Sequence, residues 1–221
     1  MLSRDDKWTH RNKEMRFILA FSLLYILISC ANSQDVTYKL VGGSCEGCEA
    51  IFEYGDKKLL AVDSLPGFIT AETKIKVTGT IFLSDGKTPA KDVILYVYHT
   101  NAKGIYPTKG DEEGWAKRHG YIRGWVKTNA DGKYSFYSLK PGAYPSRSTP
   151  AHIHPTILEP NGKYYWLGSY HFEGDPLLTD EEINPEFPRG GSSGLLILHK
   201  KGDLWQGTRD FVLGKNIPDY K

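Results

Sequence analysis

The clearest alternation of apolar and polar residues begins at residue 74. Residues 74–83 have the sequence KIKVTGTIFL, residues 84–92 are rich in turn-forming types, and residues 93–99 have the sequence VILYVYH. Period-two alternation bounded by turn residues is typical of β-strands. The sequence therefore predicts two strands here, joined by a turn.

The same pattern predicts six more strands further along the chain. They are expected at residues 121–128, 133–138, 151–158, 163–172, 195–199 and 209–213. The first two flank the turn sequence Asn-Ala-Asp-Gly and the next two flank Pro-Asn-Gly, so each pair is expected to form a hairpin.

Helix signals are scarce. Thr179 is placed to cap one short turn over residues 179–182, and Pro185 would end it. Apolar residues make up 40% of the chain and aromatic residues 13%, which suits a globular β-rich protein. We therefore expect an all-β fold, an antiparallel β-sandwich with long loops and little helix.

The N-terminal residues have the pattern of an export signal. Three basic residues precede the apolar run 17–28, which is short for a membrane span. The run closes on Leu-Ile-Ser-Cys, which resembles a bacterial lipobox and implies cleavage before Cys30, with a lipid on its sulfur. Met15 is an alternative start, and a plain secretory signal is the alternative to a lipoprotein. Neither Ala31 nor the residue after it is the aspartate that retains lipoproteins in the inner membrane, so we favour anchoring in the outer membrane.

Removing residues 1–29 would leave 23 basic and 23 acidic residues. A net charge near zero gives no electrostatic footprint for nucleic acid. The expected organisation is a signal peptide at 1–29, a lipidated tether and N-terminal arm at 30–72, and a β-sandwich at 73–221. Membrane attachment is expected through the lipid only.

Two cysteines remain in the arm, Cys45 and Cys48, in the sequence GGSCEGCE. No second cysteine pair completes a zinc site, and no βαβ pattern suggests a thioredoxin-like role. In an oxidising compartment a local disulfide that pins the arm is favoured over a redox function.

Residues 141–154 carry the strongest candidate chemistry. His152 and His154 stand two residues apart, so on a strand both imidazoles would lie on one face. Neutral imidazole binds iron, copper, zinc or nickel. Tyr144 lies ten residues before His154, and a phenolate oxygen favours a ferric ion. Two imidazoles with a phenolate therefore indicate non-haem Fe(III) rather than zinc.

Five sequence blocks occur in an order that resembles the intradiol ring-cleavage dioxygenases. They are VYHTNAKGIY (97–106), TNADGKYSF (128–136), LKPGAYP (139–145), PAHIH (150–154) and FEGDPL (172–177). The resemblance covers roughly residues 73–213. It implies a non-haem Fe(III) enzyme that cleaves a catecholic compound with O2 to a cis,cis-muconate-type diacid. Which catechol is the substrate stays open, and family members often form homo-oligomers.

The resemblance also implies a ligand set. The two family tyrosines fall on Tyr106 and Tyr144, and the two histidines fall on His152 and His154. Tyr144 would be the ligand that the catechol displaces, and the displaced groups would take the catechol protons. Tyr106 would stay bound and tune the metal.

One family feature is missing. An arginine commonly lies three positions before the first ligand histidine, where this chain has Thr149. Arg147 and Arg123 are the candidate catalytic replacements, and a surface cation is the alternative for both. His171 stands where the family often has an aromatic residue, and either a pocket or a packing role is open.

The sequence also suggests positions for other histidines and aromatic residues. His119 and His199 are expected at the surface, and His99 either beside the site or in a strand. Trp115 and Tyr121 are expected to cover a planar substrate.

The alternative function is a non-catalytic β-sandwich surface lipoprotein that binds a carbohydrate, peptide or protein partner. A zinc hydrolase is a third hypothesis, but the sequence has no obvious carboxylate base beside His152 and His154.

Overall fold

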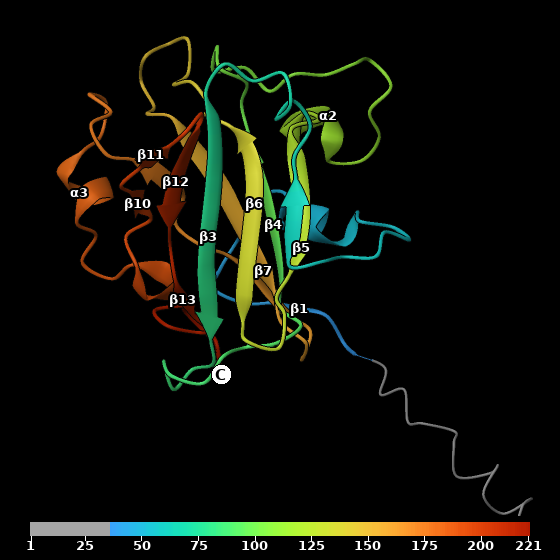
Figure 1. The fold of residues 1–221 in the computed structure, drawn as a ribbon. Helices are drawn as coiled ribbons and strands as arrows, with labels where there is room; N and C mark the ends of the chain where they lie inside the picture. The colour runs from blue at the N-terminus through green and yellow to red at the C-terminus, as the bar shows by residue number, and fades with distance from the viewer. Residues whose placement is uncertain (1–35) are drawn as a thin grey trace, which may run out of the picture. The chain divides into compact units, whose positions relative to one another are not determined.

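Two mixed β-sheets form the fold of the computed structural model, which describes residues 36–221 (Figure 1). The first sheet has the order β1-β8-β7-β4-β5, with β9 pairing β7 and β10 pairing β9. Its strands are β1 (Lys39–Leu40), β4 (Ile94–His99), β5 (Arg123–Lys127), β7 (His152–Leu158), β8 (Lys163–Trp166), β9 (Tyr170–Phe172) and β10 (Leu195–Leu196).

The second sheet has the order β11-β12-β3-β6-β2, with β13 pairing β3. Its strands are β2 (Val62–Ser64), β3 (Lys74–Phe82), β6 (Lys133–Leu139), β11 (His199–Lys201), β12 (Leu204–Thr208) and β13 (Phe211–Val212). The helical segments of residues 36–221 are short: η2 (Cys48–Phe52), α2 (Ala116–His119), α3 (Asp180–Ile183) and η3 (Arg189–Gly191). None of them is long and apolar enough to cross a bilayer.

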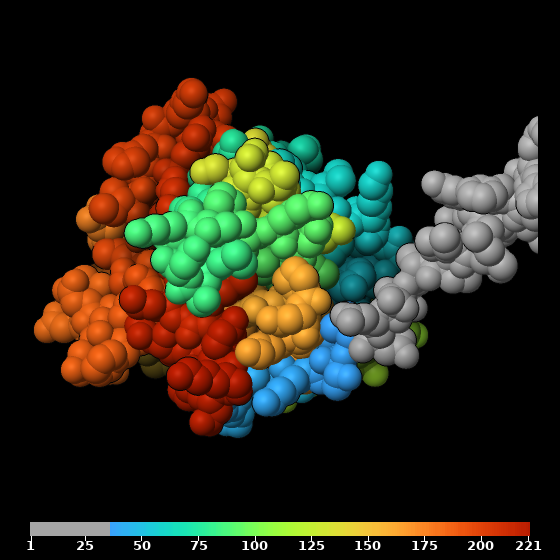
Figure 2. All heavy atoms as spheres, turned by 90° about the horizontal axis from the view of Figure 1, so that it is seen from below, coloured from blue at the N-terminus to red at the C-terminus, as the bar shows by residue number. Residues whose placement is uncertain are grey.

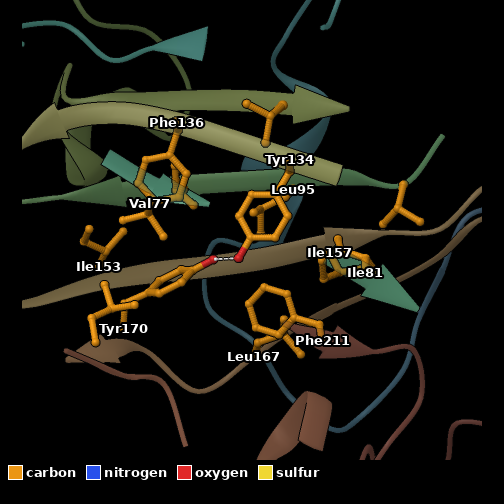
Figure 3. Packing of buried hydrophobic residues seen from close by; sticks show 14 of the residues in the cluster. Val77, Ile81, Leu95, Tyr134, Phe136, Ile153, Ile157, Leu167, Tyr170 and Phe211 are labelled. Carbon is orange, nitrogen blue, oxygen red and sulfur yellow. Dashed lines mark hydrogen bonds between the residues drawn. The ribbon is translucent and has the colours of Figure 1, made fainter. Parts of the chain in front are cut away.

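The core lies between the sheets because alternate residues of the long strands face inward. Val77 of β3, Phe136 of β6, Leu95 of β4 and Ile153 of β7 are each at most 1% exposed and pack together (Figure 3). Tyr134 also packs in this core. Its buried hydroxyl is hydrogen-bonded, with the Tyr170 hydroxyl 3.0 Å away.

The all-β sandwich is confirmed, but the sheets are not purely antiparallel. The central pairs β3–β6, β4–β5, β4–β7 and β7–β8 are antiparallel, as expected. Parallel pairs add strands at the periphery: β1–β8, β2–β6, β9–β10, β12–β3 and β13–β3. The capped turn at Thr179 is confirmed, since α3 begins with a complete capping box.

The first predicted hairpin is wrong. The turn at residues 129–132 forms, but β5 pairs with β4 and β6 pairs with β3, so the turn carries the chain from one sheet to the other. Thr128 lies directly after β5, where its hydroxyl donates to the carbonyl of Ala90 in the connection between β3 and β4. The second hairpin is confirmed as β7 and β8, with β9 a separate strand. The strand predicted at 195–199 is divided between β10 and β11 in the two sheets.

The N-terminal arm adds an edge strand to each sheet. In its described part, β1 pairs with β8 and β2 pairs with β6, and Figure 2 shows residues near β1 beside the β7–β8 turn. Between them, η2 covers the outer face of the first sheet, where Ile51 packs against Tyr96 and Trp125. The predicted signal peptide, Met15 and the lipidated Cys30 lie outside the described residues.

Candidate metal centre

Strand β7 places His152 and His154 on the outer face of the first sheet. Ile153 between them belongs to the core, so strand alternation turns both imidazoles to the opposite face. The loop after β4 brings Tyr106 to the same face, and the loop before β7 brings Tyr144. These two loops touch at Gly104, where a Cβ would collide with the carbonyl of Ala143.

Four donor atoms meet in one continuous cluster. His152 Nε2 lies 2.8 Å from His154 Nε2, which lies 2.9 Å from Tyr106 Oη. Tyr106 Oη lies 2.9 Å from Tyr144 Oη. The structure therefore brings together all four residues of the predicted ligand set, with Tyr106 and His154 in the middle.

The hydrogen bonds prepare His152 as a ligand. Its Nδ1 lies 2.7 Å from the carbonyl oxygen of Pro150, which can only accept, so Nδ1 carries the proton. The lone pair of neutral His152 is then on Nε2, which faces the other donors. Burial lowers the pKa of His152, and burial with the nearby His152 holds the pKa of His154 well below its usual range. Both shifts favour the neutral imidazole, which is the form that binds a metal.

The donor set fits a ferric ion. Within residues 36–221, no three His, Cys, Asp or Glu side chains lie together in a way that could hold a metal, so a complete set needs the phenol oxygens. Burial, and then the hydrogen bond with Tyr144, raise the pKa of Tyr106 well above its ordinary value. A phenolate at Tyr106 therefore needs a strong cation beside it, which a ferric ion supplies.

Tyr98 of β4 supports the cluster from one side. Its ring stacks on His154 at 4.5 Å between centroids and on His119 at 3.7 Å. His119 is only 5% exposed and its Nδ1 lies 2.8 Å from the hydroxyl of Tyr96. The prediction of a surface position for His119 is therefore wrong, whereas His199 is exposed as expected.

A contact from the arm contributes to this burial, together with the rings of Tyr98 and Trp115. Gly47 has φ +84°, and a Cβ there would collide with the imidazole of His119. The arm thus packs directly on His119, whose polar sequence neighbours gave no sign of burial.

The two candidate arginines lie elsewhere. Arg123 pairs with Glu53 at 2.5 Å and lies over the ring of Trp125 at 5.1 Å. Arg147 is exposed, with φ +56°, in the turn after Tyr144. Neither is among the residues that line the cavities described below. The carbonyl of Thr149 accepts a hydrogen bond from the backbone N–H of Tyr144.

Two adjoining cavities border the donors. One, of about 180 Å³, is lined by Tyr106, Tyr144, His154 and residues of the α2 region, among them Trp115 and Arg118. The other, of about 350 Å³, lies between His154, Trp166 and residues 44–47 of the arm. Glu46, Tyr98 and His154 line both. The sequence suggested Trp115 but missed Glu46, Arg118 and Trp166, because no local motif marks them.

The remaining two candidates take different places. His171 lies opposite His152 in the β7–β9 pair, with ring centroids 6.3 Å apart and its Nε2 3.8 Å from Glu182. It therefore lies beside the centre without lining either cavity. Tyr121 lines a separate hollow near Pro141.

His99 lies behind the site, and its burial is expected to make the stability of the fold depend on pH. It is fully buried, its Nδ1 lies 2.7 Å from the Thr100 carbonyl, and burial lowers its pKa to about 4. The unfolded chain then binds more protons than the folded chain between pH 6.5 and about 4. The free energy of unfolding should therefore fall as pH drops through this window, by about 3 kcal/mol from His99 alone.

Urea unfolding of the metal-free protein from pH 7.5 to 4 measures this loss. His99→Gln should reduce the slope in that range, and exposed His199→Gln should leave it unchanged. An unaltered slope in His99→Gln would show that other groups cause the dependence.

The fold and the donors define a class: an all-β protein with two imidazole nitrogens and two phenol oxygens clustered on the outer face of one sheet. A family model described as Dioxygenase matches residues 61–193. The chain belongs to this family, the intradiol ring-cleavage dioxygenases.

Curated relatives agree with this placement. The chain is 31% identical over 134 residues to the protocatechuate 3,4-dioxygenase beta chain of Burkholderia cepacia, covering 56% of this chain and 54% of the relative. It is 33% identical over 121 residues to catechol 1,2-dioxygenase 1 of Acinetobacter lwoffii, covering 48% and 38%. The chain thus spans about half the length of the first relative and less of the second.

Solved structures share the fold. The dioxygenase domain of a dioxygenase carbohydrate-binding protein fusion from Streptomyces sp. SirexAA-E has a TM-score of 0.52 at 24% identity, covering 73% of this chain and 94% of that one. An intradiol ring-cleavage dioxygenase from Tetranychus urticae has a TM-score of 0.51 at 19% identity, covering 72% and 88%.

Proposed function

We propose that this chain is a non-haem Fe(III) enzyme that cleaves a catecholic compound with O2 between its two hydroxylated carbons. The convergence of Tyr106, Tyr144, His152 and His154 within contacts of 2.8–2.9 Å carries the proposal. A bound ferric ion would hold both catechol oxygens and make the ring reactive toward O2, giving a cis,cis-muconate-type diacid.

The positions of the two tyrosines support different roles. Tyr106 Oη contacts both Tyr144 and His154, whereas the Tyr144 hydroxyl contacts only Tyr106 among the four donors. Tyr144 can therefore leave without disturbing the other three, and its loop continues into exposed residues 145–148. Once displaced, the Tyr144 phenolate can accept a proton from the incoming catechol hydroxyl.

The competing functions have less support. A surface protein that only binds a carbohydrate, peptide or protein partner has no need for four donors that converge on one point. A zinc hydrolase needs a carboxylate base beside the histidine pair, and neither ligand histidine has an ion pair with a carboxylate. Both therefore remain alternatives without a specific observation in their favour.

A visible spectrum tests the proposal. The purified full-length chain loaded with ferric iron should show a tyrosinate charge-transfer band that moves to longer wavelength when catechol is added under nitrogen. Oxygen uptake with a panel of catechols should then identify substrates. A protein that stays colourless and binds no iron after reconstitution would exclude this function.

We also propose that the chain is exported and anchored through a lipid on Cys30. The sequence of residues 17–30 is the support for this proposal. Expression in bacteria fed an alkyne fatty acid should label the wild-type chain and leave Cys30→Ser unlabelled. Equal labelling of both would exclude the anchor.

A further inference from the structure

The arm forms a fixed wall over the donor cluster. A disulfide joins Cys45 to Cys48 and closes a small loop that contains Glu46 and Gly47. Directly after it, η2 is anchored on the first sheet, where Ile51 is fully buried and its carbonyl accepts a bond of 3.1 Å from the Trp125 indole. Gly47 packs on His119. The disulfide and the contacts of Gly47 and η2 therefore hold Glu46 in place.

Glu46 lines both cavities beside the donors. Among the described residues that line the 350 Å³ cavity, Glu46 is the only Asp, Glu, Lys or Arg. A carboxylate placed in this cavity would meet the Glu46 carboxylate and no Lys or Arg side chain.

Arg118 lines the 180 Å³ cavity, but it already forms an ion pair with Glu46. The Arg118 guanidinium donates to the Glu46 carboxylate, and both residues line this cavity. A substrate carboxylate there would have to displace Glu46, which would then remain close and unpaired. Neither cavity thus offers a free cation among the described residues.

We propose that Glu46 makes this site select against catechols that carry a carboxylate, so that its substrates are catechols with neutral or cationic substituents. The inference rests on the proposed function and adds the substrate class to it. Arg118 acts as a positioning residue, because its guanidinium pairs with the Glu46 carboxylate in the lining of the 180 Å³ cavity.

The test compares three ligands that share the catechol group. They are 3,4-dihydroxybenzoate, its uncharged methyl ester, and the cationic 3,4-dihydroxyphenethylamine. We would measure kcat/KM for each with the iron-loaded protein. Dissociation constants would come from the shift of the visible band under nitrogen, a readout that does not depend on turnover.

Wild-type protein should prefer the ester over the acid. In Glu46→Gln this preference should fall by about fivefold, the scale of an interaction with an exposed charge. The preference for the amine should fall with it. In Arg118→Gln, which leaves Glu46 unpaired, the preference for the ester should rise. Asp203→Asn removes an exposed carboxylate on the β11–β12 turn and should leave the ratios unchanged.

The double variant Glu46→Gln with Arg118→Gln separates repulsion by Glu46 from attraction by Arg118. If Glu46 determines selectivity, the double variant accepts the acid better than wild type does. If it accepts the acid no better, or if Glu46→Gln alone leaves the ratio within twofold, the inference is overturned while ring cleavage stands. Absence of iron binding and turnover with all three ligands would overturn the proposed function and this inference with it.

Discussion

Replacing His154 with alanine is expected to remove ferric-ion binding and ring cleavage together. His154 Nε2 is one of two donors in the middle of the cluster, in contact with His152 and Tyr106, so its loss divides the set. Even the outer partners of metal ligands contribute about 10–100-fold to affinity or activity, so the loss of a ligand should exceed about a hundredfold. Iron content, the visible band and oxygen uptake measure the effect.

His199→Ala provides the matched control. It removes an exposed histidine from β11 in the other sheet and should leave iron content and turnover at wild-type levels. Circular dichroism of His154→Ala should show the same β-rich spectrum as wild type. A folded His154→Ala protein that keeps stoichiometric iron would refute the assignment of His154 as a ligand.

Replacing Phe136 with alanine should cause the largest loss of stability. Phe136 is fully buried between the sheets, where its ring meets Tyr170 edge to face at 5.9 Å (Figure 3). Truncating a buried Phe to Ala leaves a cavity and costs about 3–5 kcal/mol. Urea unfolding at pH 7.5 measures the change in the free energy of unfolding.

Phe187→Ala makes the same chemical change on the surface. Phe187 is 71% exposed, so its truncation should alter stability by less than about 0.5 kcal/mol. Equal losses in the two variants would mean that Phe136 does not pack in the core as described.

The site was predictable where strand alternation and local blocks determine it. On any strand, His152 and His154 share a face, and Ile153 between them is the kind of residue that faces a core. Tyr144 was a candidate because it lies close to the histidines in sequence, but Tyr106 required the family resemblance, because the contact between their loops at Gly104 leaves no periodic pattern.

The predictions that were wrong share a physical cause: each depends on contacts between residues that are far apart in the sequence. Residues 129–132 form the turn that their types predict, but whether the flanking strands pair depends on β3 and β4, which compete for them. His119 has polar neighbours and is buried by Gly47 of the arm, 72 residues earlier, as Arg118 is paired by Glu46. No local sequence pattern contains these partners.

The arm also determines the order in which the molecule can be completed. Lys39 of β1 pairs with Lys163 of β8, more than half the chain later, and Val62 of β2 pairs with Ser135 of β6. The arm precedes its partner strands in the chain, so it can pair with them only after most of the sandwich has been made. Such non-local pairing slows folding. We therefore expect the wall that carries Glu46 to close over the donor cluster late in folding.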